Sequence, residues 1–145
     1  MREDAILLIA EDDDGHYSLI KRNLLRSGIL NSIVRFKDGQ ETLDYLNSIK
    51  DSSNVYWGRP CILILDIRMP KIDGFEILAY MKDDRLLQKI PVIVLTTANN
   101  QDMVDKCQSL GCKMYVVKPV EYEQFIETIN LIGRFLSVVE IPTIA

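Results

Sequence analysis

Strand-length apolar runs that alternate with helix-length segments constrain the fold of this chain more than any other feature. The runs occupy residues 6–10, 32–36, 61–66, 91–96 and 113–117. A run that is apolar on both faces is typical of a strand buried inside a parallel sheet. Because strands that alternate with helices indicate βαβ units, we predict an α/β fold in which helices wind doubly around a five-stranded parallel sheet.

Helical spacing of apolar side chains predicts the segments between the runs. We expect helices over residues 16–27, 38–48, 75–82, 100–110 and 122–139, and one long loop over residues 49–60. A chain of 145 residues is long enough for one full hydrophobic core. We therefore expect a single domain over residues 1–145 that ends in a short extension at about 140–145.

The charge balance argues against a nucleic-acid partner. The net charge is −4, and no cluster of Lys or Arg offers contacts for a phosphate backbone. No apolar stretch approaches the roughly 20 residues of a membrane-spanning helix. Three cysteines, an odd number without close paired spacing, fit a reducing compartment, so we expect a cytoplasmic protein.

Polar side chains stand where four of the apolar runs end. Glu11 and Asp12 follow the first run, and Asp66 ends the third. Thr96 ends the fourth run, and Lys118 follows the fifth. Because the carboxyl ends of parallel strands gather at one edge of the sheet, these groups should share a crevice. Carboxylates at this density need a hard cation, while the hydroxyl and the ammonium can bind anionic oxygens, so we predict phosphoryl transfer onto Asp66.

The register of the acid cluster leaves an alternative open. Asp13 and Asp14 continue the run of carboxylates, so the metal-binding pair could be Asp12 with Asp13. We favour Glu11 with Asp12, because the strand before them is then five residues long, and either later Asp can cap the next helix. His16, the single histidine, is expected to face solvent rather than to donate a phosphoryl group.

The chain resembles the receiver domain of two-component response regulators over nearly its whole length. The motifs are the acid pair, Leu-Asp-Ile-Arg-Met-Pro followed by Asp-Gly within residues 65–74, Thr-Thr-Ala at 96–98 and Tyr-Val-Val-Lys-Pro at 115–119. In combination these motifs are very specific. The resemblance implies a flavodoxin-like sheet with strand order 2-1-3-4-5, and it implies that Asp66 accepts a phosphoryl group from a histidine kinase.

The resemblance also implies a metal site around the acceptor. Glu11 and Asp12 would hold Mg²⁺, or Mn²⁺, together with Asp66 and the backbone carbonyl of Arg68. The side chain of Arg68 could shield the phosphoryl group or lie in solvent, and the sequence favours neither position.

Further residues would carry the signal away from the acceptor. By resemblance, Lys118 and Thr96 would each contact a phosphoryl oxygen, and we expect Lys118 to serve that group rather than the resting core. Pro119 is expected to follow a cis peptide bond that aims Lys118 inward. Thr96 and Tyr115 would act as the switch, because Tyr115 would turn into the space that Thr96 leaves. The output surface would be the face made by the fourth helix, the fifth strand and the fifth helix.

Two other classes of protein share part of this pattern. Phosphatases of the haloacid dehalogenase type also use an Asp nucleophile, but they carry a second Asp two residues beyond it, where this chain has Arg68. An interaction module independent of phosphorylation would be expected to have lost an acid or the Lys, and all are present here. We therefore expect a signalling protein with self-catalysed phosphoryl transfer and dephosphorylation, not a turnover enzyme.

The last predicted helix carries more apolar surface than one helix must bury. Besides its core stripe, Leu131, Phe135 and Val138 form a second stripe about a quarter-turn away. We expect this stripe to support a homodimer, with packing under the apolar C-terminal tail as the alternative. The long loop, Leu-Thr-Thr at 95–97 and the tail resemble small response regulators that partner bacterial, chiefly cyanobacterial, phytochromes. That narrower resemblance implies a phytochrome-type histidine kinase as donor.

Overall fold

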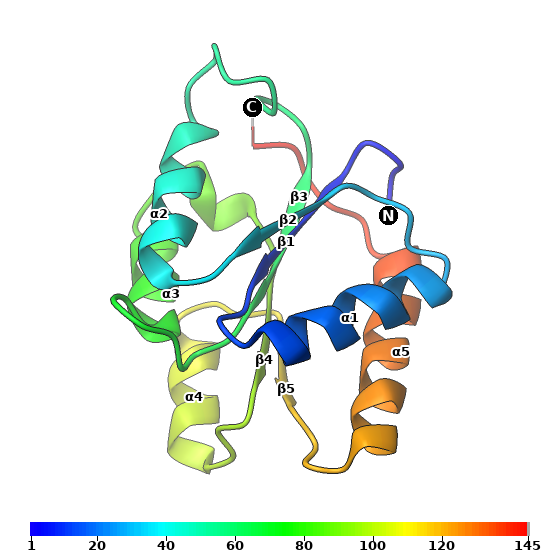
Figure 1. Ribbon diagram of the computed structural model, residues 1–145. Helices are drawn as coiled ribbons and strands as arrows, with labels where there is room; N and C mark the ends of the chain where they lie inside the picture. Colours follow the sequence, from blue (N-terminus) through cyan, green and yellow to red (C-terminus); the bar gives the residue numbers. More distant parts are fainter. Residues whose placement is uncertain (145) are drawn as a thin grey trace.

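Five parallel strands form one sheet between two layers of helices in the computed structural model, which describes residues 1–144 (Figure 1). The elements are β1 (Ile6–Ala10), α1 (Asp14–Arg26), β2 (Ile33–Phe36), α2 (Gly39–Ser48), β3 (Cys61–Leu65), α3 (Gly74–Lys82), η1 (Leu87–Lys89), β4 (Val92–Thr96), α4 (Gln101–Ser109), β5 (Met114–Val117) and α5 (Tyr122–Val138). The strands pair in the order β2-β1-β3-β4-β5. The predicted doubly wound α/β fold, with strand order 2-1-3-4-5, is confirmed.

Alternate residues of the central strands face opposite helical layers. In β1, Leu7 and Ile9 belong to the apolar cluster that contains side chains of α1 and α5. Ile6 and Leu8 belong to the cluster on the other face, which contains side chains of α2, α3 and α4. β3 and β4 alternate in the same way, and every residue of these three strands is buried. Because each buried Leu or Ile contributes roughly 1.5–3 kcal/mol, these strands are the rigid support on which the sheet edge is built.

Polar side chains set the starts of four helices. Asp13, Asp38, Asp73 and Asn100 each accept the backbone N–H three residues further on. Such caps satisfy backbone donors that a helix leaves free, and the sequence bounds agree with the structure to within two residues. The single turn η1, whose buried Leu87 packs in the core, has no sequence pattern that predicts it.

The C-terminal tail packs on the domain instead of standing free. Ile141 contacts the cluster on the α1 and α5 face, whereas Ile144 is fully buried in the cluster on the opposite face. Figure 1 shows this tail, in red, leaving α5 and running past the sheet toward the loop that follows α2. Ala145, the last residue of the predicted extension, lies outside the described residues. None of the helices in residues 1–144 is long and apolar enough to cross a membrane.

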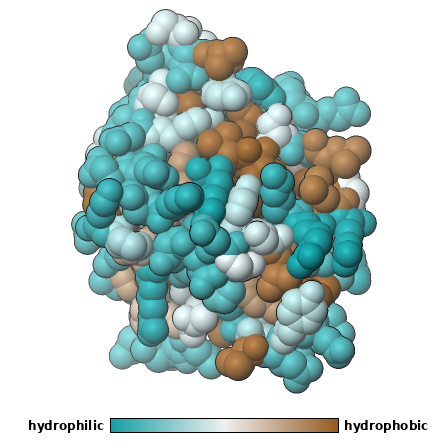
Figure 2. All heavy atoms as spheres, in the orientation of Figure 1, coloured by the Kyte–Doolittle hydropathy of each residue, from teal (hydrophilic) through white to brown (hydrophobic). Residues whose placement is uncertain are grey.

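The predicted second stripe of α5 is divided between the surface and the core. Leu131 and Val138 are 59% and 77% exposed. Phe135 is only half-buried, but it packs against the cluster formed with α1. On the face drawn in Figure 2, apolar atoms occupy separate patches among hydrophilic ones. Part of the expected apolar surplus is therefore intramolecular packing.

Candidate functional site

Carboxylates from two neighbouring strands meet at the carboxyl edge of the sheet. Glu11 directly follows β1, Asp66 directly follows β3, and the two strands pair side by side. One oxygen from each of Glu11, Asp12 and Asp66 lies within 4.8 Å of the others. Glu11 and Asp66 are buried, while Asp12 is exposed. From β1 the chain continues to β2 on one side of the sheet, whereas from β3 it continues to β4 and β5 on the other side. Open α/β sheets bind ligands at the point where the strand order reverses in this way.

The structure groups Glu11 and Asp12 with Asp66 and uses Asp13 differently. The Oδ1 atom of Asp13 accepts the backbone N–H of His16 at 2.9 Å and so caps α1. This hydrogen bond lowers the pKa of Asp13 below its ordinary value. The backbone N–H of Asp13 donates to Oε2 of Glu11 at 3.2 Å, which helps to orient that carboxylate. The alternative register, Asp12 with Asp13, is not the one that converges on Asp66.

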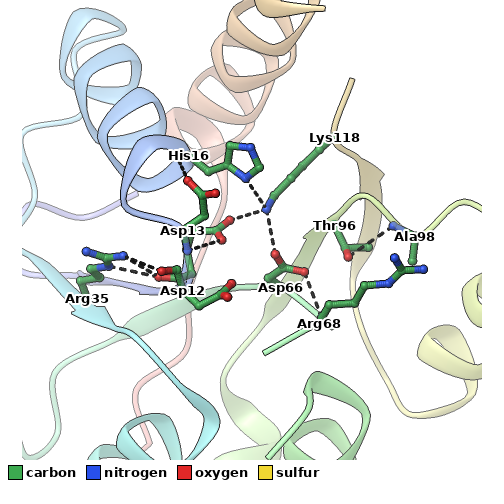
Figure 3. A network of polar contacts seen from close by, with 10 residues as sticks. Asp12, Asp13, His16, Arg35, Asp66, Arg68, Thr96, Ala98 and Lys118 are labelled. Carbon is green, nitrogen blue, oxygen red and sulfur yellow. Dashed lines mark hydrogen bonds and ion pairs between the residues drawn. The ribbon is translucent and has the colours of Figure 1, made fainter. Parts of the chain in front are cut away.

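Lys118 places its ammonium between the two buried carboxylates (Figure 3). Its Nζ donates to Oδ2 of Asp66 at 2.7 Å and to Oε1 of Glu11. Burial alone would lower the pKa of Lys118, but the charges of Asp66 and Glu11 outweigh burial and raise it. Burial raises the pKa of Glu11 to about 7, although Lys118 opposes that shift. When all are ionised, three carboxylates and one ammonium sum to −2, a charge that a divalent cation can balance.

Two expectations about Lys118 are wrong. The peptide bond between Lys118 and Pro119 is trans, not cis. Trans is the lower-energy form of an X–Pro bond by about 0.5–1 kcal/mol, and Lys118 reaches both carboxylates from it. Lys118 was also expected to serve only the phosphoryl group, yet it already pairs with Glu11 and Asp66 in the unphosphorylated protein. Buried carboxylates need such a partner of opposite charge.

His16 does not face solvent as expected. Its Nδ1 atom lies 3.2 Å from Nζ of Lys118, and its ring lies 5.5 Å from the ring of Phe125 between centroids. Nζ of Lys118 therefore lies in contact with Glu11, Asp66 and His16 together. The difference arises because Lys118 and Phe125, which are distant from His16 in the sequence, pack against its ring in the fold.

Thr96 and Tyr115 are connected through Ala98 on the other side of Asp66. Thr96 is fully buried, and its Oγ1 accepts a long hydrogen bond of 3.5 Å from the backbone N–H of Ala98. The hydroxyl of Tyr115 donates to the carbonyl of Ala98 at 2.8 Å. The backbone N–H of Arg68 donates to Oδ1 of Asp66 at 3.1 Å, while the side chain of Arg68 is exposed at the rim of the site.

Close backbone contacts hold the loop that follows β3. The N–H of Gly74 donates to the carbonyl of Ile67 at 2.8 Å, and a Cβ on Gly74 would lie 2.7 Å from Cα of Ile67. Gly39, at the start of α2, leaves no room for a Cβ beside the carbonyl of Ile72. These two glycines let both helices anchor the loop that carries the carbonyl of Arg68.

Arg35 reaches the same site from β2, although no sequence motif marks it as a site residue. Its guanidinium donates to the backbone carbonyls of Glu11 and Asp12 and pairs with Asp14. The only signal in the sequence is one cation inside a short apolar run, a pattern that a partly exposed edge strand explains equally well.

Known proteins are similar to this chain over most of its length. A model of the response regulator receiver domain matches residues 7–130. A probable methanogenesis regulatory protein, FilR2 of Methanothrix harundinacea, is 34% identical over 130 residues, covering 90% of this chain and 82% of that protein. The response regulator Rcp1 of Synechocystis sp. is 30% identical over 138 residues, covering 94% of this chain and 92% of that protein.

Solved structures superpose closely on this chain. A response regulator receiver domain from Rhodospirillum rubrum has a TM-score of 0.88 and 37% identity, covering 94% of this chain and 96% of that one. The phosphorylated cyanobacterial phytochrome response regulator RcpA has a TM-score of 0.84 and 32% identity, covering 97% and 99%. The Mn²⁺-bound form of Rcp1 has a TM-score of 0.83 and 28% identity, covering 94% and 98%.

Proposed function

This chain belongs to the response regulator receiver domain family, and we propose that it accepts a phosphoryl group from a sensor histidine kinase onto Asp66. The observation that carries the proposal is the convergence of Glu11, Asp12 and Asp66 within 4.8 Å beside the ammonium of Lys118. Response regulators of this family are signalling proteins. Phosphoryl transfer and later hydrolysis are accordingly proposed as self-catalysed steps of one signalling cycle.

Asp66 would form the new bond. One of its carboxylate oxygens would attack phosphorus while the P–N bond to the imidazole of the donor breaks, and the imidazole would leave with the electron pair. The backbone N–H of Arg68 holds Oδ1 of Asp66, and Lys118 holds Oδ2. These two contacts orient the carboxylate before the donor arrives, which supports its assignment as acceptor.

The proposed metal ligands are Glu11, Asp12, Asp66 and the backbone carbonyl of Arg68. All are oxygen donors, which Mg²⁺ and Mn²⁺ prefer. When bound, the cation neutralises charge that develops on the phosphoryl oxygens. The acidic cluster and the Mn²⁺-bound structure of the similar protein Rcp1 support this choice of cation.

Lys118 and Thr96 would convert the modification into a signal. Lys118 would exchange its contact with Asp66 for a phosphoryl oxygen, and the hydroxyl of Thr96 would turn toward another. Because the same hydroxyl accepts from Ala98, whose carbonyl binds Tyr115, this movement would reach β5. The proposed output surface is the face of α4, β5 and α5, which would shift between two packings.

A phytochrome-type histidine kinase is the partner that we propose. The similarity to RcpA, a phytochrome response regulator, over 97% of this chain supports it. A cytoplasmic location follows from that partner, and the single receiver domain over residues 1–145 would act through protein contacts. We also propose a homodimer through α5, because its exposed Leu131 and Val138 offer apolar area beside the half-buried Phe135.

Acetyl phosphate, as a small phosphoryl donor, tests the proposal without knowledge of the kinase. Incubation with acetyl phosphate and Mg²⁺ should add a phosphoryl group to the protein by intact-mass spectrometry, and excess chelator should prevent it. Labelling that persists after complete chelation would contradict the metal-dependent reaction.

A further inference from the structure

Arg35 commits its whole guanidinium to the loop that carries the acid pair. Its Nε and Nη2 donate to the carbonyl of Glu11 at 3.1 and 2.9 Å, and Nη2 lies 3.4 Å from the carbonyl of Asp12. Nη1 pairs with Oδ1 of Asp14 at 2.7 Å, and Cζ lies 4.5 Å from the ring centroid of Tyr17. The side chain is 14% exposed, so the surroundings of these contacts hold little water. Figure 3 shows the guanidinium facing the loop, with Asp12 and Asp13 between it and Lys118.

The register of the sheet explains why Arg35 reaches this loop. β2 pairs with β1 so that Arg35 lies opposite Ile9, one position before the end of the ladder. Because β1 ends at Ala10, the carbonyls of Glu11 and Asp12 have left the ladder. A backbone acceptor that loses its strand partner needs another donor, and the guanidinium supplies it to both carbonyls.

We propose that Arg35 is a positioning residue for the metal site. By holding the backbone of residues 11–14, it makes the carboxylates of Glu11 and Asp12 converge with that of Asp66. The carbonyl contacts carry this role, because the Asp14 side chain is 80% exposed and an ion pair in water contributes little. The inference rests on the proposed function, since it matters only where the acid pair binds a cation.

Charge and positioning predict opposite effects on metal binding. Arg35 is a fixed positive charge near a cation site, so by Coulomb's law alone its removal would tighten binding. If Arg35 positions the loop, its removal frees two carbonyls and lets the acid pair spread, which weakens binding. Groups that orient metal ligands typically change affinity 10- to 100-fold, and we expect Arg35→Gln to weaken Mn²⁺ binding about ten-fold because it acts through the backbone.

Titration with Mn²⁺, with the free ion followed by electron paramagnetic resonance, measures this directly. Arg35→Lys should also weaken binding, because an ammonium keeps the charge but lacks the planar fork that spans both carbonyls. Asp14→Asn removes the exposed ion pair alone, and Lys37→Gln removes an exposed positive charge two residues along the chain. Both controls should stay within about two-fold of the wild type.

Each outcome separates the role of Arg35 from the function of the site. Wild-type saturation with equal or tighter binding by Arg35→Gln would overturn the positioning role and leave the proposed function standing. A wild type without saturable Mn²⁺ binding would overturn both. If circular dichroism shows that Arg35→Gln is unfolded, Arg35→Lys decides the role by the same criterion.

The labelling rate with acetyl phosphate gives a second readout. At saturating Mg²⁺ the rate of Arg35→Gln should return to within about two-fold of the wild type, since only metal affinity is lost. A rate that stays low at saturating metal would place the effect in the transfer step and overturn the positioning role.

Discussion

Lys118 and Glu11 are 4% and 2% exposed, and neither charge would be stable at such a depth without the other. Taking an ion pair out of water costs several kcal/mol, and apolar side chains of similar size often give a more stable protein. A buried ammonium between carboxylates is thus poor support for stability by itself. Under the proposed function, its value at this sheet edge would lie in the oxygens that it leaves oriented for a cation and for an incoming phosphoryl group.

Replacing Lys118 with Ala should destabilise the metal-free protein. The change leaves Glu11 and Asp66 buried without a counter-ion, which should lower the free energy of unfolding by about 3 kcal/mol. Mg²⁺ binds the folded state and should recover much of this loss. Urea unfolding with and without Mg²⁺ measures both effects, and Lys113→Ala, at an exposed position before β5, is the control. Equal loss in the two variants would show that the buried pairs contribute nothing.

The raised pKa of Glu11 should make metal binding depend on pH. Burial moves that pKa from 4.5 to about 7 in the metal-free protein, so a proton competes with the cation over the acid range. Mg²⁺ affinity should rise with pH up to about 7 and level off above it. For folding, the sign is opposite: the protonated carboxyl stabilises the fold fully below pH 4.5, and this stabilisation is lost as pH rises through about 7.

Calorimetric titration with Mg²⁺ at a pH of about 6 and of about 8 checks the prediction for Glu11. Glu11→Gln has no proton to exchange at that position and should show a much smaller difference between the two conditions. Equal affinities of the wild type at both pH values would contradict the role given to burial.

The residues of the site were predictable to different degrees. Glu11 and Asp66 could be placed because a residue that ends a buried parallel strand must lie at the sheet edge. The positions of His16 and Arg35 depend on where α1 begins and on how far a long side chain reaches. Sequence spacing gives neither quantity. The cis bond before Pro119 was inferred from resemblance alone, and it is the expectation that the backbone contradicts.

Among the elements, strands and helices were predictable and irregular segments were not. Buried strands and capped helices have periodic apolar side chains and polar starts, which the sequence displays openly. The single turn η1 has too few residues for any period. The docking of the tail could not be predicted either, because Ile144 is buried by elements that are distant from it in the sequence. Its path across the sheet also explains why apolar residues follow α5.

The tail should therefore contribute to stability. The side chain of Ile144 is fully buried, with 0% of its surface exposed. Its replacement by Ala should lower the free energy of unfolding by about 2 kcal/mol, because apolar burial is lost and a cavity is left. Thr143→Ala, at the exposed neighbouring position, should have almost no effect. Urea unfolding curves of the two variants measure the difference. Indistinguishable midpoints would show that the tail is not docked in solution.

At the scale of the whole molecule, self-association through α5 is a proposal, because the structure contains a single chain. Phe135 is a poor probe because it packs partly inside, so the exposed pair Leu131 and Val138 is preferable. The double variant Leu131→Glu, Val138→Glu should be monomeric, because each apolar side chain contributes roughly 1.5–3 kcal/mol to an interface before association costs. Val55→Glu, at an exposed loop position 81% accessible, should not change the oligomeric state.

Light scattering at micromolar protein, with and without acetyl phosphate, distinguishes these cases. A dimeric wild type and Val55→Glu with a monomeric double variant would support the α5 interface. A wild type that is monomeric in both conditions would leave Leu131 and Val138 as ordinary surface residues.

The most direct test of the account is to locate the phosphoryl group. Wild type and variants should be incubated with acetyl phosphate and saturating Mg²⁺, and the label should be measured by intact mass before and after treatment with hydroxylamine, which cleaves acyl phosphates. We predict full, hydroxylamine-sensitive labelling of the wild type and of Asp13→Asn, whose side chain only caps α1. Asp66→Asn should remain unlabelled while it keeps its fold. Stoichiometric labelling of Asp66→Asn would contradict the central claim that Asp66 is the acceptor.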